Sequence, residues 1–226
     1  MQTNDNPRVI FENNDILIAY KPIKMLSHPE RSLNLPDLLT FFKHAEYRVI
    51  TRLDVNTSGL VLIAKNQEIS SLLNEMSKQN QIIKSYLTIC VGYFAKEEET
   101  IEAYLLKDSN QGIVRLSLSS IPNSEKITTR YKIIKEANQL SLVEVQLITG
   151  KTHQIRAHLA LVGHPVLGDP LYGNQRFNQK LRIKTQCLSS HKIKFEMIEK
   201  NHPLYYLNGQ EYINHDTLNQ RLFDKK

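Results

Sequence analysis

Several features that would direct this chain to other functions are missing from its sequence. It has only two cysteines, Cys90 and Cys187, and they do not form a CxxC pair, so we expect reduced thiols in or near the core. The apolar runs, such as residues 60–64, have about five residues, far fewer than a membrane span needs. Residues 1–6 are polar and do not resemble a signal peptide, so we expect a cytoplasmic protein.

The common nucleotide-binding motifs are also absent. The sequence contains no GxGxxG and no GxxxxGK[ST], which makes an unrelated phosphate-binding enzyme the weakest alternative. It has no internal repeat, no low-complexity tract and no change of composition that would mark a linker. We therefore expect a single domain over residues 1–226, with its core over about residues 8–200.

The composition permits a folded core and a nucleic-acid partner. Apolar residues make up 41% of the 226 residues, which is enough to build a core. Lys and Arg number 29 against 23 Asp and Glu, a formal net charge of +6. This moderate excess suits RNA or DNA, although many solvated surfaces carry as much.

The hydrophobic pattern favours strands over helices. Strands are expected over residues 9–11, 16–20, 49–53, 59–65, 82–93, 142–149 and 191–197. Helices are expected over residues 36–47, after Asn66 and over residues 152–162. In the second helix, Ile69, Leu72, Leu73 and Met76 form one apolar stripe. In the last strand, Ile193, Phe195 and Met197 alternate with polar residues. We therefore expect an α+β fold with a mixed, largely antiparallel sheet and flanking helices.

One turn places an acid at the edge of a buried strand. The run Arg52-Leu53-Asp54-Val55-Asn56-Thr57-Ser58-Gly59 precedes the apolar residues 60–64. On its own this pattern fits an Asx turn, because Asp, Asn, Thr and Ser bond to their own backbone. The less common alternative is that the turn holds the carboxylate of Asp54 where a substrate can reach it.

The same run is similar to the catalytic signature of the RluA-type pseudouridine synthases. Arg52 to Asp54 and Thr57 to Gly59 match, whereas Thr51 stands where the family usually has His. The resemblance implies the pseudouridine synthase fold, with Asp54 as the indispensable catalytic carboxylate.

A second block, Gly150-Lys151-Thr152-His153-Gln154-Ile155-Arg156-Ala157-His158, reads as a basic helix start after a strand. It is also very similar to the family's sequence, which implies that Arg156 pairs with the catalytic aspartate. Such a pair keeps a buried carboxylate ionised and fixes its direction. His153 and His158 lie five residues apart, roughly 140° around a helix, so we expect no metal site.

The third matching position is Tyr86, which follows Lys84 in the expected strand over residues 82–93. A tyrosine in a strand ordinarily packs in the core. The resemblance implies that its ring faces the target base, where stacking is worth about 1–3 kcal/mol.

A basic surface is expected near the end of the matching region. Residues 164–173 read as a loop similar to the family's, and residues 170–195 contain six basic residues and no acid. The alternatives are a solvated face and a surface that follows RNA phosphates. We take as candidate RNA-binding residues Arg52, Lys84, Lys151, His153, Arg176, Lys180, Arg182 and Lys184.

Weaker similarity extends from about residue 9 to about residue 195 and includes Lys21-Pro22 and His28-Pro29, with Lys24 in place of the usual Gly. The resemblance implies an RNA pseudouridine synthase that flips a uridine of structured ribosomal or transfer RNA into a pocket, without metal or cofactor. We expect a monomer without membrane attachment and without an S4 domain, since the polar lead is short. The alternatives are a non-catalytic RNA-binding protein of the same fold and a hydrolase of nucleosides or sugars.

Overall fold

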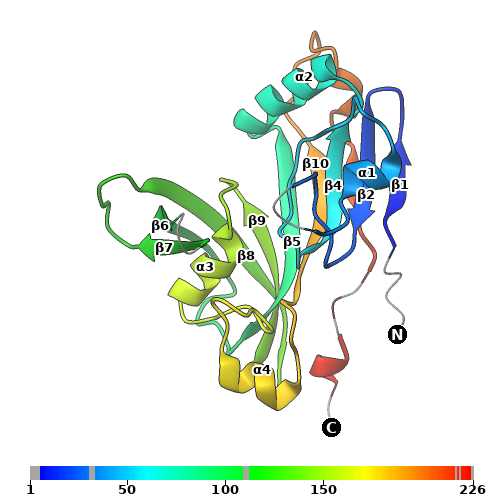
Figure 1. Cartoon of the computed structure of the whole chain (residues 1–226). Coiled ribbons are helices and arrows are strands. Elements are labelled where there is room, and N and C mark those ends of the chain that lie inside the picture. Colours follow the sequence, from blue (N-terminus) through cyan, green and yellow to red (C-terminus); the bar gives the residue numbers. More distant parts are fainter. Residues whose placement is uncertain (1–5, 31–33, 109–111, 217, 219, 225–226) are drawn as a thin grey trace. The chain divides into compact units, whose positions relative to one another are not determined.

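The structure is a computed structural model that describes residues 6–30, 34–108, 112–216, 218 and 220–224 (Figure 1). The chain divides into two compact units. The first contains residues 1–84 and 189–216, and the second contains residues 85–188 and 217–226. Strand β5 (Ile82–Val91) begins in the first unit and continues in the second.

The first unit is built on a mixed sheet. Its strands lie in the order β1-β2-β4-β10, with β3 paired to β4 and β11 paired to β10. The β4–β10 pair is parallel, and the pairs β1–β2, β2–β4, β3–β4 and β10–β11 are antiparallel. The elements are β1 (Arg8–Glu12), β2 (Ile16–Lys21), α1 (Leu38–Phe42), β3 (Arg48–Val49), β4 (Ser58–Ala64), α2 (Gln67–Lys78), β10 (Leu188–Phe195), the 3-10 helix η1 (Tyr205–Leu207) and β11 (Glu211–Ile213).

The core of the first unit lies between this sheet and α2 (Figure 1). Every residue of β2 is buried, as are all residues of β4 except the first. From α2, Ile69, Leu73 and Met76 pack into the same cluster, which confirms the predicted apolar stripe. The helix begins directly after Asn66, as predicted, and the side chain of Asn66 accepts the backbone N–H of Ile69.

The second unit has an antiparallel sheet with strands in the order β9-β8-β6-β7. Helix α3 packs on this sheet, where Ala157 joins the cluster formed by Ala103, Val114 and Ile127. The elements are β6 (Glu98–Asp108), β7 (Ile113–Ser117), β8 (Glu125–Ala137), β9 (Leu140–Leu147), α3 (Gln154–Leu161), α4 (Gln175–Leu181) and the 3-10 helix η2 (Gln220–Phe223).

The structure confirms the predicted fold class and corrects some local predictions. The first helix is shorter than residues 36–47, because Asp37 caps its start and Lys43 ends it in the left-handed conformation. Helix α4 was not predicted. Met197 does not continue the alternation of β10: its backbone is left-handed, and its exposed fraction is 67%.

Gly59 is required where β4 leaves the Asp54 turn. Its φ is +113°, and it pairs with Ser190 in the parallel β4–β10 ladder. A Cβ at this position would lie 2.1 Å from the backbone oxygen of Ser190. Only glycine therefore allows both the backbone conformation and the close approach of the two strands.

We predict that Gly59→Ala lowers the free energy of unfolding by about 3 kcal/mol or more, because backbone strain and a steric clash add together. Urea denaturation measures this change. The matched control is Gly209→Ala, since Gly209 has a φ of +79° but an added Cβ there would meet no atom within 4 Å. An equal loss in both variants would show that the contact with Ser190 contributes nothing.

Candidate active site

The backbone around Asp54 is a tight turn that leads into β4. The N–H of Thr57 donates to the carbonyl oxygen of Asp54 at 3.0 Å, and Asp54 itself is half-buried. Thr51 is buried, and its hydroxyl accepts the N–H of Leu62 in β4 at 2.8 Å. Thr51, which stands where the family usually has His, thus anchors the segment before this turn to strand β4.

Both sequence neighbours of Asp54 are held by side chains from the segment 21–27. The hydroxyl of Ser27 accepts the N–H of Leu53 at 3.0 Å and donates to the carbonyl oxygen of the same residue at 3.2 Å. The ammonium of Lys21 donates to the carbonyl oxygen of Val55 at 3.4 Å. These contacts restrict the backbone on either side of Asp54, so that the direction of its side chain is restricted too.

Lys21 is fully buried at the end of β2. Its ammonium also donates to the carbonyl oxygens of Pro22 and Met25, at 2.9 and 2.8 Å. With Val55 these acceptors match the three N–H donors of a protonated lysine. Burial lowers the pKa of Lys21 to about 7, and the negative charge of Asp54 opposes this decrease. Sequence reasoning placed Lys21 in the early family signature but did not predict a buried cation beside Asp54.

The lowered pKa of Lys21 predicts a pH dependence of stability. A lysine in the unfolded chain has a pKa near 10.4, so between about pH 7 and 10 the unfolded state binds more protons than the folded state. The free energy of unfolding should therefore rise with pH across this window relative to Lys21→Met, which lacks the titrating group. Urea denaturation of both proteins at several pH values measures the difference. A difference that stays constant with pH would contradict this prediction.

In the second unit, Arg156 of α3 forms a buried ion pair with Asp169. Its Nε donates to Oδ2 at 2.7 Å and its Nη2 donates to Oδ1 at 3.0 Å, a two-point contact. The exposed fractions of the two residues are 4% and 0%. Burial by itself would raise the pKa of Asp169, but the Arg156 guanidinium and the N–H groups of Tyr172 and Leu171 together lower it.

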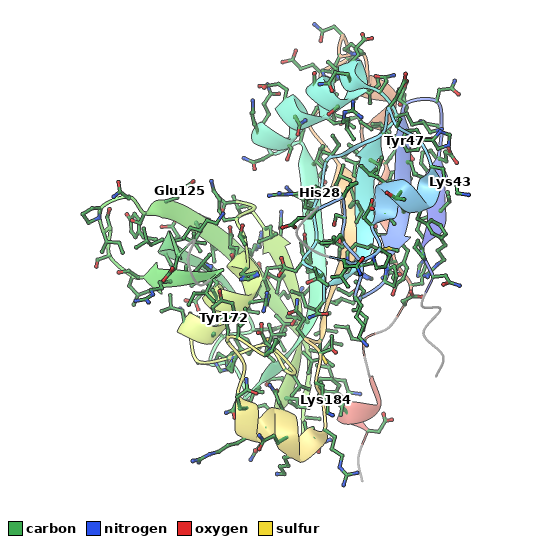
Figure 2. The ribbon with its side chains drawn as sticks, in the orientation of Figure 1. His28, Lys43, Tyr47, Glu125, Tyr172 and Lys184 are labelled. Carbon is green, nitrogen blue, oxygen red and sulfur yellow. The ribbon has the colours of Figure 1, made fainter. Side chains whose placement is uncertain are left out.

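Tyr172, labelled in Figure 2, connects this ion pair to its surroundings. The guanidinium carbon of Arg156 lies 5.3 Å from the centre of the Tyr172 ring. The Tyr172 hydroxyl accepts the N–H of Val114 at 2.9 Å and lies 3.1 Å from Nδ1 of His153. Two residues of the second motif, His153 and Arg156, therefore meet at one tyrosine.

The candidate residues are distributed over both units. The first unit contains Arg52, Asp54 and Lys84. The second unit contains the other candidates: Tyr86, Lys151, His153, Arg156, Arg176, Lys180, Arg182 and Lys184. Tyr86 lies in β5 with an exposed fraction of 6%. Burial lowers the pKa of Lys84, and Lys151 is exposed and pairs with Glu125.

Asp169 is the residue that sequence reasoning undervalued. It lies in the predicted loop over residues 164–173, among residues that favour turns. The pair with Arg156 became visible only through the fold, because the two residues lie 13 positions apart in the chain. The only signal in the sequence was an acid immediately before a long segment without acids.

The basic segment divides between the two units. Arg176, Lys180, Arg182 and Lys184 are exposed on and just after α4, and Lys184 is labelled in Figure 2. The lysines of β10, at positions 192 and 194, belong to the first unit and pair with acids from outside the segment. The α4 residues are therefore the stronger candidates for contacts with phosphates.

The histidines of the second motif do not gather around an ion. His158 is fully buried, its Nδ1 lies 2.9 Å from the Thr129 hydroxyl, and burial lowers its pKa to about 4. Within the described ranges, no three His, Cys, Asp or Glu residues are grouped so that they could hold a metal. Among the helices that the structure describes, none is long and apolar enough to span a membrane.

Comparisons with known proteins decide the family. A family model described as RNA pseudouridylate synthase matches residues 15–161, which include the Asp54 turn and α3. The chain belongs to the RNA pseudouridylate synthase family. The RluA-type resemblance of the two motifs is thereby confirmed.

Individual members of the family cover most of the chain. An uncharacterized RNA pseudouridine synthase of Mycoplasma genitalium is 32% identical over 213 residues, covering 86% of this chain and 65% of that protein. The ribosomal large subunit pseudouridine synthase C of Vibrio parahaemolyticus is 30% identical, covering 83% of this chain and 61% of that protein. The chain thus spans somewhat less than two thirds of the length of these relatives.

Solved structures support the same fold. The human RNA pseudouridylate synthase domain containing 1 has a TM-score of 0.71 with 21% identity, and the match covers 96% of this chain and 94% of that one. The human RNA pseudouridylate synthase domain containing 4 has a TM-score of 0.72 with 18% identity, covering 95% and 89%.

Proposed function

We propose that this chain isomerises uridine to pseudouridine within structured RNA, with Asp54 as the catalytic carboxylate. The observation that carries the proposal is the restrained turn around Asp54, in the part of the chain that matches the family. Its two units would act together as one catalytic domain. The isomerisation involves no change of oxidation state, so the proposal needs no redox cofactor, and we assign no metal to it.

The proposed reaction exchanges one bond of the uracil for another. The bond between C1′ and N1 breaks, the uracil turns, and a bond forms between C1′ and C5. The hydrogen of C5 leaves as a proton and N1 gains one, so atoms and charge balance. Asp54 attacks C1′ or removes a proton from the ribose, and either route needs one ionised carboxylate. An ordinary glycosidase instead uses two carboxylates and a water molecule.

Arg156 and Tyr86 complete the proposed machinery. Arg156 is buried and is held by a two-point contact with Asp169. We assign to Arg156 the second task of pairing with Asp54, as the resemblance implies. The ring of Tyr86 would stack on the flipped uracil, and Arg52 would contact the flipped nucleotide or fill the space that the base leaves.

The RNA would be held mainly through its phosphates. Four exposed basic residues on and after α4 supply charge without depending on base sequence: Arg176, Lys180, Arg182 and Lys184. A relative is named for the large ribosomal subunit, so ribosomal RNA is the first substrate to test and transfer RNA the second. Unpaired loop bases are the preferred targets, because they are flipped at low cost.

We predict that Asp54→Asn abolishes the reaction but keeps RNA binding, because the amide has the shape of the carboxylate but cannot attack C1′ or accept the ribose proton. Tritium release from 5-tritiated total RNA, prepared from cells lacking the gene, measures bond formation at C5. Filter binding of the same RNA measures retention.

The matched control is Asp216→Asn, which removes an exposed acid paired with Arg8 in the same unit and should react at the wild-type rate. Tritium release by Asp54→Asn would refute the assigned role. Release of free uracil by the wild type would instead indicate a hydrolase. RNA binding by the wild type without any reaction would indicate a binding protein.

We also predict that replacing the four basic residues on and just after α4 by Gln flattens the salt dependence of RNA binding. If each contacts one phosphate of single-stranded RNA, the slope of log K against log salt concentration changes by about 3. Filter binding at several salt concentrations measures the slope. The control changes Lys192 and Lys194 to Gln, because both pair with glutamates, and should leave the slope unchanged. Equal effects of the two sets would contradict the assignment.

A further inference from the structure

We propose that Asp169 is a positioning residue of the reaction: it fixes the direction of the Arg156 guanidinium, to which the proposed function assigns a part in the reaction. This inference rests on the proposed function and adds a second essential acid to it. Asp169 would touch neither RNA nor the reacting atoms. Its effect would pass entirely through the arginine.

The geometry of the ion pair suits this role. Two parallel hydrogen bonds, at 2.7 and 3.0 Å, fix both the position and the plane of the guanidinium. The Tyr172 ring lies 5.3 Å from the guanidinium carbon and limits movement of the side chain further. An arginine held at one edge in this way presents its other edge in a constant direction.

Asp169 is itself held firmly. Its Oδ1 accepts the backbone N–H groups of Leu171 and Tyr172, at 2.8 and 3.1 Å. Its carbonyl oxygen accepts Nδ2 of Asn178 at 3.2 Å, and Oδ1 of the same asparagine accepts the N–H of Gly168 at 2.7 Å. The carboxylate therefore stands on a loop that α4 ties down through one buried asparagine.

Stability alone is a weak reason for this pair. Removing two charges from water costs several kcal/mol per ion, and apolar residues of the same volume are often at least as stabilising. Arg156 and Asp169 are nevertheless almost completely buried, in the motif that the reaction is proposed to use. A requirement for a fixed guanidinium accounts for the pair.

The test is Asp169→Asn, which keeps an oxygen for the two backbone N–H groups but loses the charge and one of the acceptors of Arg156. We expect the single-turnover rate of tritium release from 5-tritiated total RNA to fall by about 10–100-fold, as for other residues that orient a reacting group. RNA retention in filter binding should stay within twofold of wild type. A wild-type rate in this variant would overturn the inference.

The matched control is Ser141→Ala, which removes two hydrogen bonds of a buried side chain in the second unit without touching Arg156 or the loop that carries Asp169. This variant should have a lower melting temperature than the wild type. Well below that temperature it should react within about threefold of the wild-type rate, because the substituted side chain does not contact the guanidinium. If Ser141→Ala loses as much rate as Asp169→Asn, the loss reflects general destabilisation of the unit, the ion pair has only a structural role, and the inference fails.

A second variant covers the case in which Asp169→Asn does not fold. Asp169→Glu keeps the charge but moves the carboxylate by one methylene, so the guanidinium should shift and the rate should fall while RNA binding is retained. A wild-type rate would again overturn the inference.

Combining Asp169→Asn with Arg156→Lys provides a separate test. If Asp169 acts through Arg156, the double variant should be no more than about twofold slower than Arg156→Lys alone. Independent, multiplying losses would overturn the inference while leaving the proposed function intact. Absence of tritium release by the wild type would overturn both.

Discussion

The contacts that hold the Asp54 turn are the constraint on which the proposed chemistry depends. Two buried side chains from one segment, Lys21 and Ser27, bind the backbone of the residues on either side of Asp54. The glycine that leaves the turn lets β4 approach β10 closely. An aspartate in an unrestrained turn would bond to its own backbone. Here the surrounding contacts restrict that freedom before any substrate binds.

The second unit applies the same principle to a cation. Arg156 is oriented by Asp169 and by the Tyr172 ring, and the loop that carries the acid is tied to α4. Both reactive groups of the proposal are thus held by buried polar contacts rather than by apolar packing alone. Burying polar groups costs free energy unless they are paired. Hydrogen bonds and ion pairs are also directional, which suits groups whose orientation decides the reaction rate.

Short-range patterns in the sequence predicted much of this structure. Periodicity and capping placed α2 and β4, and the two motifs identified the family and the residues to examine. The Arg156–Asp169 pair and the position of Lys21 beside Asp54 could not be predicted, because both depend on contacts between segments distant in the chain. The basic segment was read as one surface, but its last two lysines pair with acids from outside it. The Lys192–Glu211 pair depends on the pairing of β10 with β11, whereas Lys194 and Glu196 lie two residues apart and pair locally.

The central claim is that Asp54 forms pseudouridine in a cellular RNA. The most direct measurement maps pseudouridine in total RNA from cells with the gene, without it, and with an Asp54→Asn copy in its place. The account predicts that one or more sites vanish without the gene and remain absent when only the Asp54→Asn copy is present. Maps that do not change on loss of the gene, or sites that return with the Asp54→Asn copy, would contradict it.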